Sequence, residues 1–525
     1  MLFNSVVFIF FFLPVTLCIY LWLRTHDRYR SALVWLVLAS LFFYGWWNPQ
    51  YVLLMVLSIA VNYSIGMLLD KHSSYRFFTL CIGVLFNLGL LAYYKYTDFV
   101  LDALNTYTGS HWDLPHIVLP LAISFVTFQQ IAYIVDAYRR KDRAKDVLRY
   151  CLFVTFFPQL IAGPIVHHNE MIPQFGHRFL RRTLWINIAV GLSVFAMGLF
   201  KKMVLADGVA LYATPVFDAA GHGYVLTFFE AWAGALAYTL QIYFDFSGYC
   251  DMAIGLARMF GIQIPINFAS PYKANNIIDF WRRWHITLSR FLRDYLYFPL
   301  GGSRKGNVRR YINVLIVMFL GGIWHGAGWT FIVWGLLHGT YLAINHALRD
   351  VLAWSGIKFT GRWTIYMASI ASRCLTLLAV VVAWVFFRAE DMETAQSILE
   401  SMFGMHGVSL LGSLQGLLSA QQIAWLETYG ISFSGMFYNG LANFNVGIIW
   451  IVVLMICTQI LPNTQTIMRK YKTGLSDISK HVKDKPSFIG WRINMLSGIV
   501  VGILFFFSFS KWFAATPSEF IYFNF

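Results

Sequence analysis

The stretch FLGGIWHGAGWTFIVWGLLHG, residues 319–339, is apolar enough for the wall of a membrane protein, yet it carries two histidines. His325 stands between Trp324 and Gly326, and His338 follows near the end. A titratable imidazole among lipid-facing side chains costs free energy that leucine or phenylalanine would not. We therefore expect these histidines to be hydrogen-bonded, buried in protein, or used in chemistry.

The composition of the chain sets its class. Of 525 residues, 58% are hydrophobic and 12% are charged, which excludes a soluble globule. Apolar runs long enough to cross about 30 Å of hydrocarbon as helices recur, whereas the alternation of an outer-membrane barrel is not visible. The sequence predicts an all-α polytopic membrane protein with about eleven to thirteen crossings.

The apolar runs give twelve candidate spans. They lie near 3–23, 32–47, 50–69, 77–96, 117–136, 148–166, 185–205, 226–258, 311–346, 366–387, 446–462 and 491–513. The runs 226–258 and 311–346 are long enough to be broken pairs. No small-residue cleavage site follows the first run, so we expect a retained helix and a mature chain that starts at Met1.

Basic residues indicate the topology. The formal net charge is +15, and lysine and arginine gather in five clusters, at 24–30, 139–149, 177–182, 304–310 and 469–485. Such clusters mark cytoplasmic loops and contact anionic lipids. They lack the stacking aromatics of a nucleic-acid groove, so we predict no nucleic-acid partner. We expect a multi-pass protein of a bacterial cytoplasmic (inner) membrane with both termini on the periplasmic side.

Cysteines and the region 388–445 carry less information. Six cysteines are scattered singly, without the spacing of a zinc site or a disulfide framework, and are expected to be small core residues; we predict no metal. Residues 388–445 are mixed and glycine-rich, which predicts an exterior loop with a short helix.

Residues 275–302 have the pattern of an amphipathic interfacial helix. Asn276 followed by Asp279 is typical of a helix start, and Pro299 with the glycines after it is typical of a stop. A 3.6-residue wheel places an apolar face opposite a strip of four arginines. The apolar face holds Ile277, Phe280, Trp281, Trp284, Leu288, Phe291, Leu292 and Tyr295, and the strip holds Arg282, Arg283, Arg290 and Arg293.

His285 falls at the border of these two faces, and two interpretations stay open. In the first, the arginines hold lipid phosphates and His285 only fills the seam between the faces. In the second, the arginines receive the phosphates of an anionic donor and His285 orients a reactive group.

Three ordered motifs resemble the core of the membrane-bound O-acyltransferase (MBOAT) family. They are YFDFSGYCDMAIGLARMFG (243–261), FWRRWHITLSRFLRDYLYFPLGGSRKG (280–306) and GGIWHGAGWTFIVWGLLHG (321–339). The bacterial polysaccharide branch, typified by the membrane subunit of alginate O-acetylation, is the most similar, and FFPQLIAGPI (156–165) and LFNSVVFIFFFLPV (2–15) also resemble it. His167 and His168 depart from the pattern, because several relatives have an arginine there.

The resemblance implies one membrane-embedded acyltransferase domain over residues 1–525, with core motifs at 243–340 and an exterior tail at 514–525. Interfacial and re-entrant helices would surround a central tunnel in which a cytoplasmic acyl donor meets an exterior acceptor. It also implies an exterior acetyltransferase partner and a polysaccharide acceptor such as alginate or cellulose. Acetyl-CoA is the expected donor, with no permanently bound cofactor.

The family's WHG motif makes His325 the expected catalytic residue, and His285 occupies the family's second position, filled by Asn or His. Neutral imidazole can take the proton of an attacking alcohol as a general base. The glycines around His325 favour irregular backbone beside a cavity. We expect the four arginines and Trp324 to bind the donor, and the Trp324 indole or a backbone N–H to stabilise the oxyanion.

Other polar residues in the apolar runs have simpler interpretations. His338 is expected to be a hydrogen-bonded core residue, and Asp245 and Asp251 to accept structural hydrogen bonds. No serine or cysteine lies in a recognisable nucleophile elbow. A transporter or flippase stays a remote alternative, although no pseudo-repeat is visible. An MBOAT enzyme of teichoic-acid D-alanylation, or one with a lipid or protein acceptor, also stays open.

The tail SEFIYFNF, residues 518–525, is too aromatic to be left in water, so it should dock. It can pack as an interfacial aromatic anchor. Its ending also resembles that of the small membrane peptide that accompanies teichoic-acid D-alanylation. By that resemblance Tyr522 is a candidate acyl carrier, which would accept acetyl with His325 as base and pass it to the exterior partner.

Overall fold

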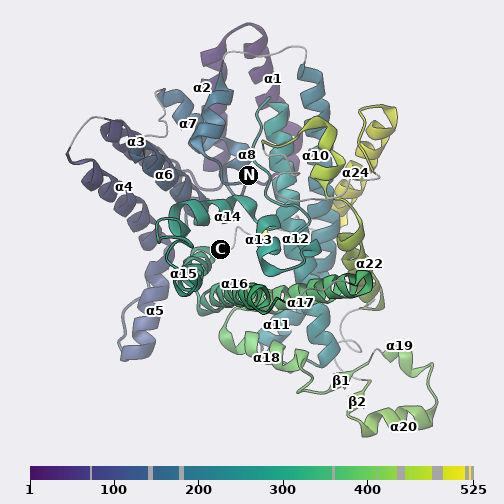
Figure 1. The fold of residues 1–525 in the computed structure, drawn as a ribbon. Helices are drawn as coiled ribbons and strands as arrows, with labels where there is room; N and C mark the ends of the chain where they lie inside the picture. The colour runs from purple at the N-terminus through teal and green to yellow at the C-terminus, as the bar shows by residue number, and fades with distance from the viewer. Residues whose placement is uncertain are drawn as a thin grey trace.

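The computed structural model describes residues 1–70, 74–139, 146–176, 183–356, 361–410, 412–433, 444–475, 489–514 and 520–521. Helices dominate it (Figure 1). Up to residue 221 they are η1 (Phe8–Phe12), α1 (Leu13–Thr25), α2 (Tyr29–Gly45), α3 (Gln50–Asp70), α4 (Arg76–Leu91), η2 (Ala92–Tyr96), α5 (Thr97–Thr108), α6 (Ile123–Tyr138), α7 (Val147–Thr155), α8 (Phe157–Leu160), α9 (His168–Met171), η3 (Ile172–Phe175), α10 (Leu184–Phe200), η5 (Lys201–Ala206) and α11 (Asp207–Gly221).

The remaining elements include the three predicted motif regions. They are α12 (Phe228–Met259), η6 (Pro271–Lys273), α13 (Ile277–Arg283), α14 (Ile286–Leu292), η7 (Arg293–Tyr297), α15 (Asn307–His325), α16 (Trp329–Ser355), α17 (Arg362–Arg388), α18 (Met392–Met402), β1 (Val408–Ser409), α19 (Gly412–Gln415), α20 (Ala420–Thr428), β2 (Ile431–Ser432), α22 (Phe444–Ile460), α23 (Thr464–Ile467), η8 (Arg469–Tyr471) and α24 (Met495–Ala514). The strands β1 and β2 form one short parallel pair.

Long apolar helices confirm the predicted all-α polytopic membrane fold. Within the described residues, six are long and apolar enough to cross a membrane: Phe8–Thr25, Gln50–Leu69, Arg76–Thr108, Leu184–Gly221, Arg362–Arg388 and Met495–Trp512. Tyr29–Gly45 and Val446–Ile460 are apolar but shorter. The sequence-based expectation of about eleven to thirteen crossings also counted α12, α15 and α16, which are long enough but contain charged side chains.

Of the two runs predicted to be broken pairs, only one breaks. The run 311–346 divides between α15 and α16 after His325. The run 226–258 does not divide, because α12 continues without interruption from Phe228 to Met259. The glycines of this run do not interrupt the helix; two of them let it pack closely against α10.

The helices α10 and α12 lie side by side at the centre of the bundle (Figure 1) and approach through paired glycines. A Cβ on Gly198 would lie 2.6 Å from the carbonyl oxygen of Gly248, and a Cβ on Gly255 would lie 2.5 Å from that of Gly191. Only glycine permits backbones so close, which is how small residues pack membrane helices.

More peripheral elements flank this centre. Figure 1 shows α3, α4, α5 and α6 as one wing of the bundle. The region 388–445 is richer than the predicted exterior loop with one short helix, because α18, α19 and α20 and both strands lie in it. The strands have two residues each, and a segment of that length shows no hydrophobic periodicity.

Replacement of Gly198 by leucine should force α10 and α12 apart, because its side chain would meet the backbone of Gly248 and Met252. Overpacking of this kind costs roughly 1–3 kcal/mol or more. We expect a lower thermal unfolding midpoint for the purified variant in detergent. Gly502→Leu on α24, where a Cβ meets no atom of the described residues within 4 Å, is the matched control and should unfold like the parent.

Candidate active site

His325 is the last residue of α15, and three residues separate it from the start of α16. The chain is extended at Gly326 and at Gly328, so the helix cannot continue. The break therefore fixes His325 at a helix end inside the protein, where its side chain is only 4% exposed.

The glycines around His325 allow α15 and α16 to touch. A Cβ on Gly322 would lie 2.4 Å from the carbonyl oxygen of Phe331, and one on Gly335 would lie 2.5 Å from that of Met318. A Cβ on Gly326 would lie 2.1 Å from the Phe331 ring. The glycine-rich motif is thus needed for close helix packing as well as for the break.

Aromatic rings surround the His325 imidazole. The ring centroids of Trp324 and Trp334 each lie 4.9 Å from that of His325, and the Phe387 centroid lies at 5.3 Å. The His285 ring is 6.5 Å away, so the structure brings together the two histidines that the motifs identified.

His285 lies between two short helices, which corrects the prediction of one continuous amphipathic helix over 275–302. Asn276 does cap the start, since its side chain accepts a hydrogen bond from the Asp279 amide. The helix then ends at Arg283, and His285 adopts a left-handed conformation with φ of 42° before α14 begins. The periodicity missed this because apolar residues on both sides of the break face the same core.

Asn267 fixes the orientation of His285. The side-chain oxygen of Asn267 accepts hydrogen bonds from the amide and the hydroxyl of Thr287, at 3.2 and 3.0 Å. The same oxygen lies 3.1 Å from Nδ1 of His285, so Nδ1 must carry the proton and donate it. Nε2 of the neutral imidazole therefore carries the lone pair.

An aromatic layer made of Trp281, Trp334, Trp384 and Phe387 lies beside His325 and His338. His338 is buried against it, and its Nδ1 accepts a hydrogen bond from the Trp281 indole at 3.3 Å. The interpretation of His338 as a hydrogen-bonded core residue agrees with this contact.

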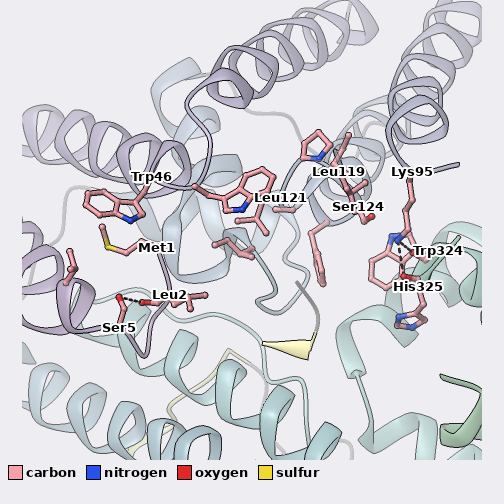
Figure 2. Close-up of a pocket in the computed structure, with 17 residues that line it drawn as sticks. Met1, Leu2, Ser5, Trp46, Lys95, Leu119, Leu121, Ser124, Trp324 and His325 are labelled. Carbon is pink, nitrogen blue, oxygen red and sulfur yellow. Dashed lines mark hydrogen bonds between the residues drawn. The ribbon is translucent and has the colours of Figure 1, made fainter. Parts of the chain in front are cut away.

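A cavity of about 440 Å³, here called the His325 cavity, opens beside the imidazole (Figure 2). Its lining is mostly apolar, and Lys95, Ser5, Ser124, Trp324 and His325 supply its polar groups. Figure 2 shows Lys95 reaching down to the end of α15. Within the described residues, the buried indole N–H groups of Trp324 and Trp334 have no hydrogen-bond partner.

A second cavity of about 470 Å³, here called the arginine cavity, lies along α13, α14 and α16. Arg282, Arg290 and Arg293 line it together with Trp281 and His346. Arg283 is not among its lining residues, because its side chain turns into the protein and pairs with Asp279 at 3.0 Å. Three of the four predicted arginines therefore share one cavity, and the fourth pairs with Asp279 outside its lining.

Two of these arginines already hold carboxylates. Arg290 makes a two-pronged contact with Glu170, at 2.6 and 2.9 Å, and Arg293 pairs with Asp294 at 2.8 Å. Burial alone would raise the pKa of Glu170, but the hydrogen bond and charge of Arg290 outweigh it, and the pKa lies below its usual value. An anion that enters this cavity has to compete with an ionised Glu170.

Buried ion pairs explain the carboxylates of α12. Asp245 contacts Lys202 at 2.6 Å, and Asp251 contacts Lys201 at 2.7 Å and the Gln465 amide at 3.0 Å. Both aspartates accept hydrogen bonds, as the sequence predicted.

The described part of the C-terminal tail docks beside Asp245. Phe520 is 1% exposed, packs edge-on against Tyr249 and lies under the Lys202 ammonium, and the Ile521 amide donates to Asp245 at 3.0 Å. Tyr249 in turn stacks on Phe3, whose neighbour Leu2 lines the His325 cavity. Tyr522, the candidate acyl carrier, lies outside the described residues.

Known proteins are similar in sequence to this chain over most of its length. A peptidoglycan O-acetyltransferase from Helicobacter pylori is 46% identical over 438 residues, which cover 78% of this chain and 81% of that protein. The model of the membrane-bound O-acyltransferase family matches residues 137–387. The chain belongs to the membrane-bound O-acyltransferase family. A probable alginate O-acetylase from Azotobacter vinelandii is 42% identical over 436 residues, 81% of this chain and 83% of that protein.

The chain is therefore an O-acyltransferase and a multi-pass membrane protein, as the motifs predicted. This sets aside the transporter and flippase alternatives. A teichoic acid D-alanyltransferase from Bacillus subtilis is more distant, at 27% identity over 284 residues, 52% of this chain and 68% of that protein. The segment matched by the family model contains His285, His325 and the four arginines predicted to bind the donor, but neither Lys95 nor Tyr522.

Sequence reasoning missed three residues of the site. Lys95 is the only residue of a charged type in the predicted apolar run 77–96, and that was a usable signal, because an intramembrane charge needs a partner. Asn267 and Glu170 lie far in sequence from the side chains that they hold. No local pattern identifies such partners, since the contacts exist only in the folded chain.

Proposed function

We propose that this acyltransferase moves an acetyl group from a cytoplasmic thioester donor to a polysaccharide on the other side of a bacterial cytoplasmic membrane, with His325 as general base. One observation carries the proposal. The arginine cavity reaches the aromatic layer at Trp281, and the His325 cavity reaches His325 itself, while Trp334 contacts both residues. A donor and an acceptor that stay on different sides of a membrane need two such entrances.

The basic clusters indicate which of the two cavities faces the cytoplasm. The helix α15 begins in the cluster 304–310 and ends at His325, and the antiparallel α16 returns to His346 beside the arginines. Because lysine and arginine favour cytoplasmic loops, the arginine cavity is assigned to the cytoplasmic side. The His325 cavity and both termini are then periplasmic.

The proposed reaction is acyl transfer from sulfur to oxygen. An acceptor hydroxyl attacks the thioester carbonyl carbon while His325 takes its proton, and the carbon–sulfur bond breaks as the thiol leaves with that proton. General-base assistance of this kind contributes about 10²- to 10⁴-fold. The buried indole N–H of Trp324 is the candidate donor to the oxyanion, because it lines the cavity and has no other described partner.

Acetyl-CoA is the proposed donor. Its phosphates suit the arginine cavity, and Arg282, Arg290 and Arg293 supply the charge. The aromatic and aliphatic walls, including Trp281, Ile286 and Leu342, suit the apolar part of a pantetheine arm.

Tyr522 is the proposed relay between donor and polysaccharide. The anchored Phe520 supports it, because its partner Tyr249 stacks on Phe3, next to the wall of the His325 cavity. The Tyr522 phenol would attack the thioester with His325 as base and release the thiol. An exterior partner protein would then move acetyl from the aryl ester to a sugar hydroxyl, which restores the phenol.

The polymer is tested directly in the producing cell. Deletion of the protein should remove O-acetyl groups from one exterior polysaccharide, measured by ester release and NMR of alginate, cellulose and peptidoglycan fractions. Loss of D-alanyl esters in place of acetyl groups would establish the teichoic-acid alternative. Unchanged acetylation of every fraction would overturn the proposed function.

His325→Ala should abolish acetyl transfer in purified vesicles, because the hydroxyl proton then has no base. The substitution deletes no large apolar contact, so the variant should stay folded and inserted. Near-parental transfer by the folded variant would show that His325 is not the base.

His285→Asn is the comparison variant, because asparagine tolerates a left-handed backbone and keeps a polar side chain. We expect an intermediate rate for it, and for His285→Ala a rate below the parent but above His325→Ala. A parental rate in both would return His285 to a structural role.

Charge reversal at Arg282 and Arg293 should raise the apparent KM for acetyl-CoA and make it less sensitive to salt, since both line the arginine cavity. Reversal of Arg304 and Lys305, which are not among the lining residues of that cavity, makes the same change in charge and is the control. Equal donor dependence in both variants would leave the cavity arginines as lipid contacts.

Tyr522→Phe keeps the ring and removes only the hydroxyl. We expect polysaccharide acetylation to be lost at a normal protein level, and an acetyl adduct on Tyr522 of the parent protein by mass spectrometry. Normal acetylation by the variant would rule out the covalent relay while leaving direct transfer by His325 intact.

A further inference from the structure

The end of α15 has backbone carbonyls that need hydrogen-bond donors from outside the helix. The last four carbonyls of any α-helix lack intrahelical partners, and here they belong to Gly322, Ile323, Trp324 and His325. The backbone after His325 is extended and returns one bond, from the Gly326 amide to Gly322 at 3.4 Å. In an apolar interior, each carbonyl left without a donor costs free energy.

The other three carbonyls receive donors from η2, a π-helical turn of a different span. The Tyr96 hydroxyl donates to the Ile323 carbonyl at 2.8 Å. The Lys95 ammonium donates to the carbonyls of Trp324 at 2.6 Å and of His325 at 3.0 Å. All four carbonyls are therefore satisfied, and two adjacent side chains of η2 supply three of the bonds.

Lys95 is costly where it lies. It places an ionisable amine inside the apolar span Arg76–Thr108, in a position where methionine would pack with no desolvation cost. A cation at a helix C-terminus is favourable, because it faces the negative end of the helix dipole. π-Helical turns such as η2 are also frequent at functional sites.

We propose that Lys95, assisted by Tyr96, is a positioning residue for acyl transfer that holds the backbone of His325 from outside its own helix. The inference rests on the proposed role of His325. Lys95 and His325 line the same cavity, and Figure 2 shows the lysine side chain descending to the end of α15. Without these bonds the last turn of α15 frays, and the imidazole moves relative to the reacting carbonyl.

The predicted consequence is a loss of turnover with donor binding intact. Displacement of a catalytic group by about 1 Å can cost about 10²-fold in rate. Lys95→Met should therefore lower kcat roughly ten- to hundredfold in purified vesicles, while the KM for acetyl-CoA stays within about twofold. Lys95→Arg keeps a charged donor and should recover part of the loss, and Tyr96→Phe should lower kcat by a few-fold.

A second lysine gives the matched control. The Lys273 ammonium donates to the carbonyls of Leu461 at 2.7 Å and Ile460 at 3.4 Å, at the end of α22, and is not among the described residues that line either cavity. Lys273→Met removes the same kind of cap away from His325 and should keep the parental kcat. Thermal unfolding of each variant in detergent separates loss of fold from loss of turnover.

The outcomes distinguish the inference from the proposed function. A parental kcat in folded Lys95→Met, with His325→Ala inactive, overturns the positioning role alone. A rise in KM at constant kcat makes Lys95 a binding residue and overturns it too. If Lys95→Met fails to fold, the folded Tyr96→Phe decides, because a parental kcat there overturns the inference and a lowered kcat at constant KM supports it. Activity of His325→Ala overturns the proposed base itself.

Discussion

Hydrogen bonding of backbone carbonyls away from water is the constraint on which the site depends. A helix that stops at the surface leaves its last carbonyls to solvent, but α15 stops inside the protein at His325. Three of its last four carbonyls are satisfied by side chains from η2, which belongs to the wing of α3 to α6 (Figure 1). The same hydrogen bonds therefore hold the end of α15 at His325, form part of the cavity beside it, and join that wing to the core.

Charges inside the bundle follow the same logic. The adjacent lysines of η5 each meet a carboxylate of α12, and one of those carboxylates also receives the amide of Ile521. Removing one member of a buried pair costs about 3–5 kcal/mol, because the other charge is left without compensation. Charged residues in apolar helices therefore tie together segments that lie far apart in the sequence, here η5, α12 and the chain's end.

Much of the fold and part of the site were predictable from the sequence. Apolar runs gave the helical membrane class, and the ordered motifs gave the family and the two candidate histidines, which the structure brings together. The pattern failed where its signal is ambiguous. A glycine in an apolar run is compatible with a helix break or with a close helix contact. In 226–258 the glycines make close contacts in an unbroken helix, whereas around His325 they accompany both a break and close contacts. The break at His285 and the partners Lys95, Asn267 and Glu170 depend on contacts between distant segments, which one sequence does not display.

The left-handed backbone at His285 limits which side chains fit at this position. A β-branched or bulky side chain at this φ is strained, whereas histidine, asparagine and aspartate adopt such angles several-fold more often than other residues with a side chain. Of these three, aspartate would bring a carboxylate next to the Asn267 oxygen, which already accepts three hydrogen bonds. Backbone geometry and the polarity of one neighbour thus leave histidine and asparagine as the compatible side chains, whatever the chemistry at this position demands.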